Sequence, residues 1–349
     1  MAFSVVMPLE VSGEAAKYPS LFAKAGVAFT GRRCSAEEEV IALARDADAI
    51  ITEGSQCPVR RHVIENLNNC QLIAGTQIGY DTFDIEAATE RGILVTNVPG
   101  YCIEEVSDHA MALVLACARQ VVALNDAARR GEWGFGPNSA EIKEGIRGRM
   151  DALGGKTLGI FGFGAIGRSL VPKAKGFRMR VIACDPFIEP STGAELGVEM
   201  VDWATLLRES DFLSIHAALT DETRRVFDDS AFHLMKPGAC LINTARGGFV
   251  DEDALHAALS ERRLGMAALD VLGTEPPAGI NPLLTLDNVI STAHSAFYSP
   301  RALETQWLRP AQEVLRVFRG RWPVAIVNPS ARQRFVERFG AMKEPESEE

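Results

Sequence analysis

The chain has 349 residues, which is long for a single hydrophobic core and predicts two domains. Hydrophobic residues make up 47% and charged residues 23% of the sequence, and the net charge of −10 argues against nonspecific binding to nucleic acid. The seven scattered cysteines form no CxxC pair, and neither a secretory leader nor a membrane-spanning apolar run is evident. We therefore expect a cytoplasmic protein with reduced thiols, no metal site and no membrane partner.

The first hundred residues alternate short apolar runs with helical patterns. The expected strands are 4–7, 49–52, 72–74 and 93–96, and the expected helices are 36–46, 59–67 and 84–91. This alternation predicts a parallel βαβ sheet without a glycine fingerprint. A long apolar helix is expected at 104–118, followed by a loop at 130–153 that is rich in glycine, asparagine and charged residues.

A second βαβ array follows this loop. Its expected strands are 157–162, 180–184, 212–215, 239–243, 266–269 and 289–291, and a last helix is expected at 300–318, before an extended segment at 325–327. The predicted fold is α/β, with two Rossmann-like or flavodoxin-like parallel-sheet domains and a ligand cleft between them. We expect one domain from residues 1–118 and 299–335, a second from 119–298, and a disordered acidic tail at 336–349.

The most specific local motif is a glycine turn between an apolar strand and a helical segment. Gly162 allows a tight turn, Gly164 lets the backbone approach a pyrophosphate, and Gly167 lets the helix pack on the strand. The unpaired N–H groups at the start of the helix then favour the bound anion. The expected contacts to the dinucleotide also include the rest of the turn, Phe163, Ala165 and Ile166.

Asp185 completes this fingerprint, because it lies 18 residues after Gly167 at the end of the next expected strand. Its carboxylate can accept hydrogen bonds from the hydroxyls of an adenine ribose. A 2′-phosphate would meet this negative charge, and no Arg or Lys follows immediately. The sequence therefore predicts NAD rather than NADP as the cofactor.

Polar residues follow four other expected strands, where an α/β protein assembles its site. Arg246 lies in an Asn-Thr-Ala-Arg-Gly-Gly segment, Asp270 precedes Glu275 by five positions, and His294 follows the last strand. In the first domain the corresponding segment runs over residues 75–81. Arginine suits a carboxylate because its guanidinium forms a bidentate fork, and a carboxylate beside an imidazole favours the charged ring.

The chain resembles the D-isomer-specific 2-hydroxyacid dehydrogenases in three motifs that occur in the same order. These are the segment that begins at Asn243, the Asp-Val at Asp270 with the following Glu-Pro at Glu275, and the late His294. Residues 99–110 and 294–299 are most similar to the branch that includes the C-terminal-binding-protein corepressors. The resemblance covers roughly residues 40–330.

This resemblance implies the roles of the polar residues. Arg246 grips the substrate carboxylate, His294 is the general acid and base, and Glu275 is its partner carboxylate. Asp270 holds the nicotinamide carboxamide. Other residues expected to line the cofactor cleft are His216, Thr244 and Ala245, and His109 is expected to be structural or to lie behind the site.

The expected substrate contacts are Thr76, Gln77, Ile78, Gly79, Tyr101 and Phe297, with the backbone N–H groups of residues 76–79 binding the carboxylate. Five features depart from the family pattern. Many members carry an arginine at the place of Ala165, an arginine at Gly75 and a glycine at Gln77. Phe297 replaces the usual tryptophan of the corepressor branch, and residues 134–153 form a longer segment than usual.

The sequence thus predicts an NAD-dependent D-2-hydroxyacid dehydrogenase, active on a small 2-oxo acid of the glyoxylate, hydroxypyruvate or phosphoglycerate type. The resemblance also implies a homodimer. Two alternatives stay open at this point: an NAD(H)-sensing corepressor-like scaffold without turnover, and a relative that oxidises another small donor such as formate or phosphite. The direction of the reaction and the phosphorylation of the substrate are not decided by the sequence.

Overall fold

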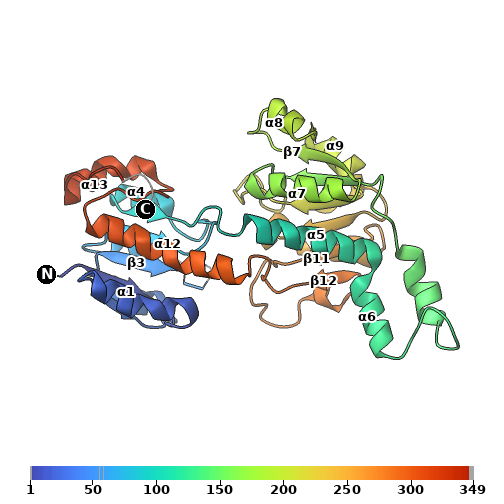
Figure 1. Cartoon of the computed structure of the whole chain (residues 1–349), viewed down its shortest axis with the longest axis horizontal. Helices are drawn as coiled ribbons and strands as arrows, with labels where there is room; N and C mark the ends of the chain where they lie inside the picture. Colours follow the sequence, from blue (N-terminus) through green and yellow to red (C-terminus); the bar gives the residue numbers. More distant parts are fainter. Residues whose placement is uncertain (1, 55, 58, 346–349) are drawn as a thin grey trace. The chain divides into compact units, whose positions relative to one another are not determined.

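The computed structural model describes residues 2–54, 56–57 and 59–345, which form two compact units (Figure 1). The first unit contains Met1–Tyr101 and Ser299–Glu349, and the second contains Cys102–Tyr298. Each unit is a parallel β-sheet with helices packed against it, as the sequence predicts.

The first unit has a five-stranded parallel sheet in the order β2-β1-β3-β4-β5. This is the flavodoxin-like order, in which the chain changes direction across the sheet between β1 and β3. The elements of this unit are β1 (Ser4–Met7), η1 (Gly13–Lys17), α1 (Tyr18–Lys24), β2 (Ala28–Gly31), α2 (Glu37–Ala44), β3 (Ala49–Thr52), α3 (Arg61–Glu65), β4 (Leu72–Gly75), α4 (Ile85–Glu90), β5 (Leu94–Thr96), α12 (Pro300–Phe318), η6 (Pro329–Ala331) and α13 (Arg332–Phe339).

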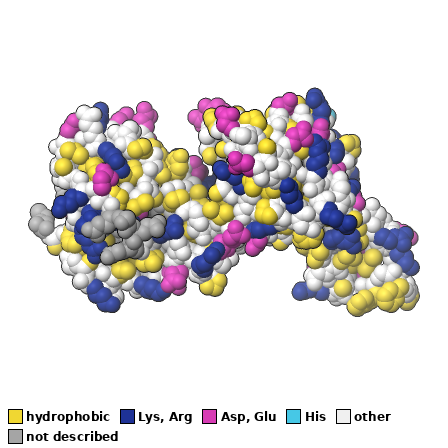
Figure 2. Space-filling model, turned by 45° about the horizontal axis from the view of Figure 1, so that its top comes forward, with side chains coloured by type: hydrophobic (Ala, Val, Ile, Leu, Met, Phe, Trp, Pro, Cys, Tyr) yellow, Lys and Arg dark blue, Asp and Glu magenta, His cyan; other side chains and the backbone are white. Residues whose placement is uncertain are grey.

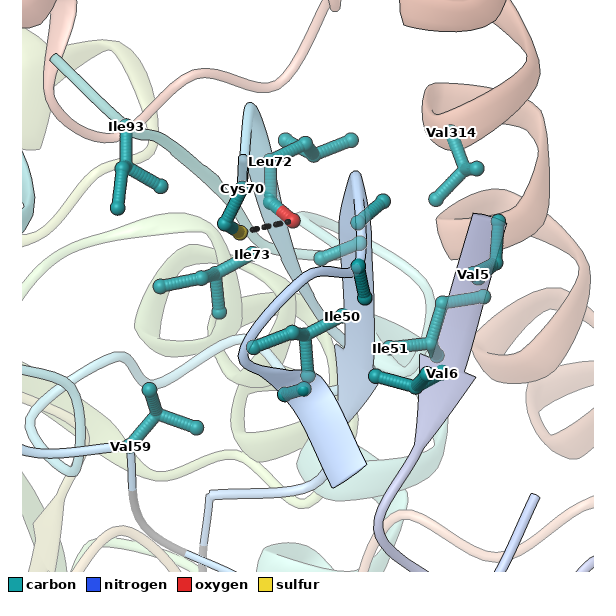
Figure 3. Packing of buried hydrophobic residues seen from close by; sticks show 14 of the residues in the cluster. Val5, Val6, Ile50, Ile51, Val59, Cys70, Leu72, Ile73, Ile93 and Val314 are labelled. Atoms are coloured by element: carbon teal, nitrogen blue, oxygen red, sulfur yellow. Dashed lines mark hydrogen bonds between the residues drawn. The ribbon is translucent and has the colours of Figure 1, made fainter. Parts of the chain in front are cut away.

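The core of the first unit forms because its central strands bury both faces (Figure 3). All four residues of β3 and of β4 are buried, which is why these strands read as continuous apolar runs. Val314 of α12 packs into the same cluster as Ile50 and Ile73, so the late helix returns to cover the early sheet.

The second unit has a seven-stranded parallel sheet in the order β12-β11-β10-β9-β6-β7-β8. This is the Rossmann order with one added strand, and its direction changes between β6 and β9. The elements of this unit are α5 (Ile103–Arg119), α6 (Val121–Arg129), η2 (Glu141–Ile146), η3 (Arg147–Arg149), β6 (Thr157–Phe161), α7 (Ala165–Gly176), β7 (Arg180–Cys184), α8 (Pro190–Glu195), β8 (Glu199–Met200), α9 (Trp203–Glu209), β9 (Phe212–Ile215), α10 (Asp229–Leu234), β10 (Cys240–Asn243), η4 (Gly247–Phe249), α11 (Glu252–Ser260), β11 (Met266–Leu269), η5 (Pro282–Thr285) and β12 (Val289–Ser291).

Helix α5 belongs to the second unit, although the sequence predicts residues 102–118 as part of the first domain. Its apolar face, which includes Ala110, Val114 and Cys117, lies in the core cluster of the seven-stranded sheet. The periodicity of the sequence shows that this helix has a buried face, but it does not show against which sheet that face packs.

The predicted disordered tail at 336–349 is wrong for its first part. Helix α13 continues to Phe339, because Phe335 is fully buried and packs on Trp322 with ring centroids 5.5 Å apart. The backbone of Lys343 then pairs with that of Arg321 in an isolated β-bridge. Residues 346–349 lie outside the part of the chain that the structure describes.

The segment after α5 carries large hydrophobic side chains on its surface. Val121, Val122, Trp133 and Phe135 are 53%, 43%, 59% and 78% exposed, and Figure 2 shows yellow side chains gathered at this end of the unit (lower right). No single helix in the described residues is long and apolar enough to cross a membrane. Helices α5 and α6 reach that length only together, as a pair bent by 62°.

Candidate active site

The glycine turn between β6 and α7 has the geometry that its three glycines predict. Gly162 has a φ of +92°, and a Cβ there would lie 2.3 Å from the backbone nitrogen of Ala217. A Cβ on Gly167 would lie 2.5 Å from the carbonyl oxygen of Gly162, so the helix could not pack this closely on the turn. A Cβ on Gly164 would meet nothing within 4 Å, which leaves the backbone of the turn open on that side.

The start of α7 offers hydrogen-bond donors to this open space. Gly164 is the N-cap residue and provides no side-chain cap, so the N–H groups of the first helical turn remain available as donors. The side chain of Arg168 reaches back and donates from Nε to the carbonyl of Phe163 at 3.0 Å. An exposed guanidinium therefore borders the turn although Ala165 lacks the charge that many family members carry.

Asp185 lies at the end of β7 and also holds the turn in place. Its Oδ2 accepts a hydrogen bond of 2.8 Å from the N–H of Phe163, and its Oδ1 accepts one of 3.0 Å from the N–H of Phe187. A carboxylate oxygen accepts two hydrogen bonds, so each oxygen retains a lone pair for a ribose hydroxyl. The anchoring role is a finding that spacing alone did not reveal.

Arg246 is presented by a turn that Asn243 closes at the end of β10. The Asn243 side chain accepts from the N–H of Ala245 at 3.0 Å and donates to the carbonyl of Arg246 at 2.8 Å. The Arg246 guanidinium donates back to the carbonyl of Ala245 at 2.8 Å. These three bonds fix the arginine at the carboxyl end of the sheet, where the sequence predicts it.

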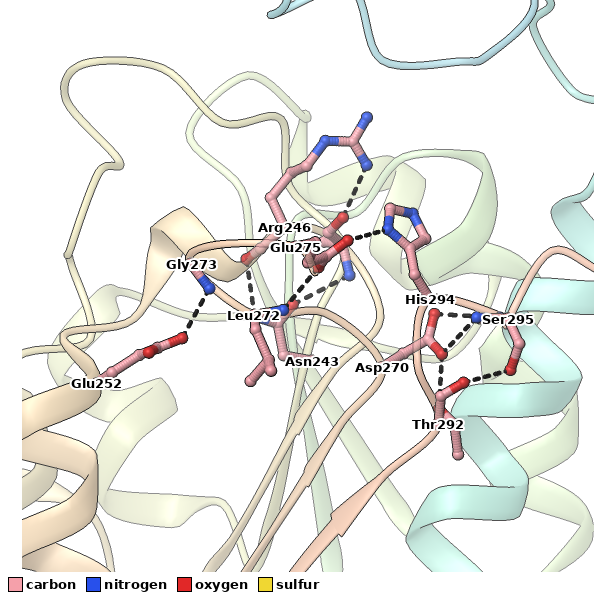
Figure 4. A network of polar contacts seen from close by, with 12 residues as sticks. Asn243, Arg246, Glu252, Asp270, Leu272, Gly273, Glu275, Thr292, His294 and Ser295 are labelled. Atoms are coloured by element: carbon pink, nitrogen blue, oxygen red, sulfur yellow. Dashed lines mark hydrogen bonds and ion pairs between the residues drawn. The ribbon is translucent and has the colours of Figure 1, made fainter. Parts of the chain in front are cut away.

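Glycine at position 247 allows the next loop to pass over this turn. A Cβ there would lie 2.0 Å from the carbonyl carbon of Leu272, so only glycine leaves room for that backbone. Glu252 of α11 holds the same loop, because it accepts from the N–H of Gly273 at 2.7 Å and from Asn281 at 2.9 Å. The loop then brings Glu275 beside the arginine turn (Figure 4).

Glu275 and His294 form the central contact of the site (Figure 4). Nδ1 of His294 lies 2.5 Å from Oε2 of Glu275, and Oε1 of Glu275 accepts from the N–H of Leu272 at 2.7 Å. Because a carboxylate can only accept, Nδ1 carries a proton and Nε2 is the ring atom left to exchange one. This is the orientation that a general acid and base needs.

The electrostatic environment favours the charged pair. The hydrogen bond that His294 donates to Glu275 raises the pKa of His294 above its ordinary value, although burial and Arg246 act in the opposite direction. Burial alone would raise the pKa of Glu275, but the hydrogen bonds from His294 and from the Leu272 N–H lower it. His294 therefore holds its transferable proton at a higher pH than a free histidine does.

Asp270, at the end of β11, holds the loop that carries His294. Its backbone carbonyl accepts from the N–H of His294 at 2.6 Å. Its carboxylate, which is almost fully buried, accepts from the N–H groups of Ser295 and Ala296 at 2.8 and 3.1 Å and from the hydroxyl of Thr292 at 2.6 Å. The predicted contact of Asp270 with a nicotinamide carboxamide stays a prediction, but the carboxylate clearly shapes this loop.

The remaining predicted cofactor residues lie at the ends of neighbouring strands. The hydroxyl of Thr244 is buried and has no hydrogen-bond partner among the described residues. His216 follows β9, contacts the hydroxyl of Ser214 at 2.8 Å, and lies beside Gly162. Burial lowers the pKa of His216 to about 4, so its ring is neutral at physiological pH.

In the first unit, the predicted carboxylate loop follows β4. The N–H of Thr76 donates to the carbonyl of Thr52 within the sheet, so this residue does not supply a free backbone donor as expected. The carbonyls of Gln77 and Ile78 accept from Val98 N–H and the Asn97 amide, whereas no hydrogen bond among the described residues uses the N–H groups of positions 77–79. Three neighbouring backbone donors are therefore available to an anion.

The side chain of Gln77 is held by the segment after β3 and by its own segment after β4. Its Oε1 accepts from the N–H of Gly54 at 2.9 Å, and its Nε2 donates to the hydroxyl of Thr82 at 3.2 Å. A Cβ on Gly54 would lie 2.7 Å from that Nε2, so the amide fills the space above this glycine. Gln77 thus links the segment after β3 to the segment after β4.

The other predicted substrate residues are divided between the units. Phe297 lies in the second unit, where its ring meets the His294 ring edge to face with centroids 6.1 Å apart. Tyr101 is buried and belongs to the first unit, as do Thr76 and Gly79. The second unit therefore assembles Arg246 and the His–Glu pair by itself. No group of His, Cys, Asp or Glu in the described residues could hold a metal ion.

The sequence of the second unit matches a family model. Residues 111–296, more than half of the chain, match the model described as "D-isomer specific 2-hydroxyacid dehydrogenase, NAD binding domain". The chain is 40% identical to a glyoxylate reductase of Thermococcus litoralis over 287 residues, which is 81% of this chain and 84% of the relative. It is also 38% identical to a D-3-phosphoglycerate dehydrogenase of Methanocaldococcus jannaschii over 309 residues, but spans only 56% of that protein's length.

Solved structures agree with these sequence matches. The crystal structure of a glyoxylate reductase from Paecilomyes thermophila has a TM-score of 0.83 and 26% identity, and the match covers 93% of this chain and 98% of that one. The family and the fold that the sequence predicts are thus confirmed, while the likeness to the corepressor branch stays a prediction. The chain belongs to the D-isomer-specific 2-hydroxyacid dehydrogenases, oxidoreductases that act on CH–OH groups with NAD.

Proposed function

We propose that the chain is an NAD-dependent D-2-hydroxyacid dehydrogenase that reduces a small 2-oxo acid, or runs the reverse reaction. The observation that carries this proposal is the contact of 2.5 Å between His294 and Glu275, beside Arg246. An acid–base pair with an oriented Nε2 supports turnover over a scaffold that only senses the dinucleotide.

The residues of the second unit fit NAD. The open side of Gly164 and the donors at the start of α7 suit a pyrophosphate, and Asp185 retains lone pairs for the ribose hydroxyls. The buried hydroxyl of Thr244 lacks a protein partner, so a bound group would satisfy it. When bound, NADH supplies the hydride that reduces the carbonyl carbon of the substrate.

The residues of the chain control the proton and the orientation. Protonated His294 donates from Nε2 to the carbonyl oxygen as negative charge develops there, and Glu275 stabilises the positive ring throughout. Arg246 binds the substrate carboxylate with its guanidinium fork. Within the first unit, the three unused N–H groups of residues 77–79 are donors of the kind that binds an anion.

The first unit favours a substrate without a phosphate group. The loop segments at 53–57 and 77–81 contain Glu53 and Asp81 but neither lysine nor arginine. Arg60 and Arg61 are the nearby basic pair, and Arg61 is already engaged by Glu90 at 2.9 Å. We therefore place glyoxylate and hydroxypyruvate before phosphorylated acids.

The direct test is the oxidation of NADH with a panel of acids: glyoxylate, hydroxypyruvate and 3-phosphohydroxypyruvate. We expect turnover of the first two. An Arg246→Ala variant should lose roughly 10- to 100-fold in kcat/KM, since a charge-assisted hydrogen bond contributes about 1.5–3 kcal/mol. Micromolar NADH binding without turnover of any acid would instead support a scaffold.

The exposed hydrophobic residues of segment 121–135 support a homodimer, because a second copy could bury them. Light scattering should then give a mass near twice 37.8 kDa, and Phe135→Asp should shift it toward the monomer. A monomer at micromolar concentration would contradict this proposal. Seven free cysteines in the described chain are consistent with a reducing, cytoplasmic location.

A further inference from the structure

The loop that carries His294 has an unusual backbone. Ala293 and His294 have φ angles of +52° and +57°, so two consecutive residues with side chains occupy the left-handed region. Residues other than glycine rarely adopt this conformation, and it persists only where surrounding contacts enforce it. The contacts that hold this loop therefore determine where the imidazole of His294 points.

Those contacts converge on Asp270, to which the side chain of Thr292 donates a hydrogen bond, while Nε2 of His109 lies 3.8 Å from the same carboxylate oxygen. The Thr292 hydroxyl lies 2.6 Å from Oδ1 of Asp270 and 2.9 Å from Nε2 of His109. Its carbonyl accepts from the hydroxyl of Ser295 at 2.6 Å, on the other side of the left-handed pair. Thr292 is thus bonded on both sides of the turn that presents His294.

The direction of each hydrogen bond follows from the number of hydrogens. Asp270 accepts from two backbone N–H groups and therefore acts as an acceptor toward Thr292 as well. The hydroxyl of Thr292 has a single hydrogen, which it donates to Asp270. It must then accept from His109, so Nε2 of His109 carries a proton and this ring is fixed in one orientation.

The chain of contacts joins three elements that are distant in the sequence. His109 lies on α5, Asp270 follows β11, and Thr292 follows β12. Helix α5 packs in the core of the same unit, so His109 is a fixed point against which the loop can be held. Neither His109 nor Thr292 makes a described hydrogen bond or ion pair with Glu275, so neither touches the acid–base pair directly.

We propose that Thr292 and His109 are positioning residues that hold the left-handed loop and thereby aim His294 at Glu275 and the substrate. This inference rests on the proposed dehydrogenase function for its kinetic consequence, but its structural consequence is independent of turnover. Loss of the Thr292 hydroxyl relaxes the loop and misplaces the imidazole, while the cofactor turn between β6 and α7 is unchanged.

The test compares Thr292→Val, which keeps the shape but removes the hydroxyl, with Thr292→Ser, which retains the hydroxyl. Thr285→Val is the matched control, because it removes a threonine hydroxyl of the same unit that donates to the carbonyl of Pro282 and makes no described contact with His294. For Thr292→Val we expect kcat to fall by about 10- to 100-fold, since small misplacements of a catalytic group have effects of this size. KM for glyoxylate and Kd for NADH should stay within about twofold, and Thr292→Ser should recover most of kcat.

A second readout does not need turnover. The proton on Nδ1 of His294, bonded to a carboxylate, should give a downfield proton NMR signal that His294→Ala removes. Thr292→Val should shift or broaden this signal, and Thr292→Ser and Thr285→Val should retain it. Replacing His109 with Leu should reproduce the effect of Thr292→Val, whereas His109→Gln, which keeps an N–H donor, should be milder.

The outcomes separate the inference from the proposed function. If the wild-type chain reduces no acid but the signal responds to Thr292→Val as expected, the positioning role stands and the dehydrogenase proposal fails. An unchanged signal, or a kcat within twofold of the wild type, overturns the positioning role. Equal losses in the Val and Ser variants also overturn it, as does a change confined to Kd for NADH, which would assign this network to the cofactor.

Discussion

The substitution Glu275→Gln tests the electrostatic core of the site. It keeps the size of the side chain and an oxygen that can accept from Nδ1 of His294, but it removes the negative charge 2.5 Å away. A hydrogen bond between charged groups contributes about 1.5–3 kcal/mol. Because His294 and Glu275 are 37% and 31% exposed, solvent screening reduces this contribution to about half, roughly 0.8–1.5 kcal/mol.

This free energy corresponds to a loss of roughly 4- to 13-fold in kcat/KM for reduction near neutral pH. The pH dependence follows from the sign of the shift. Glu275 raises the pKa of His294, and reduction needs the protonated ring, so the wild-type rate falls as pH rises through that raised pKa. Without the carboxylate the pKa decreases, and the alkaline limb of the reduction profile should move to lower pH.

The assay is kcat/KM for glyoxylate reduction between pH 5 and 10, measured for the wild type, for Glu275→Gln and for a control variant, Glu252→Gln. Glu252→Gln is the matched control, because Glu252 holds the same loop through Gly273 and makes no described contact with His294. We expect this control to lower thermal stability without moving the alkaline limb. An alkaline limb that stays in place in Glu275→Gln, or that moves equally in both variants, would refute the electrostatic argument.

Three further predictions concern the cofactor, the substrate loop and the packing of the site. Asp185→Ala should lower the ratio of NAD to NADP activity by at least tenfold, because the repulsion of a 2′-phosphate is removed; an unchanged ratio would show that this carboxylate does not select the cofactor. Gln77→Gly should raise KM for glyoxylate several-fold with a smaller effect on kcat, since the hydrogen bond to Gly54 that holds the segment after β4 is lost; in steady-state kinetics, a lower kcat with an unchanged KM would contradict this role. Gly247→Ala should destabilise the chain by about 2 kcal/mol or more in urea unfolding, because its methyl group would overlap the following loop, and a loss below 0.5 kcal/mol would contradict the packing.

Much of the fold could be predicted because its strands are buried on both faces. Strand β3 and the central strands of the second sheet read as apolar runs, and the predicted bounds agree with the structure within about one residue. Strand β2 was not predicted, since it lies at the sheet edge and has only half-buried and exposed residues. Helix α5 was assigned to the first domain because periodicity does not identify the sheet that a helix covers.

In the site too, residues that follow a strand could be predicted from the sequence, whereas contacts between distant parts of the chain could not. Arg246, Glu275 and His294 could be found because each follows a predicted strand and the carboxyl ends of parallel strands meet at one edge. The role of Thr292 could not be found, because its partner on α5 is 183 residues away in the sequence. In the sequence, Gln77 is recognisable only as a departure from a family pattern. Its hydrogen bond with Gly54 depends on the tertiary arrangement of two loops.

The most direct measurement of the central claim is the NADH-dependent reduction of glyoxylate by the wild type and by His294→Ala. A positioned acid contributes about 10²- to 10⁴-fold to a proton-coupled step, so we predict a loss of kcat of this size with NADH binding retained. A His294→Ala variant that turns over glyoxylate at a rate close to that of the wild type would contradict the account.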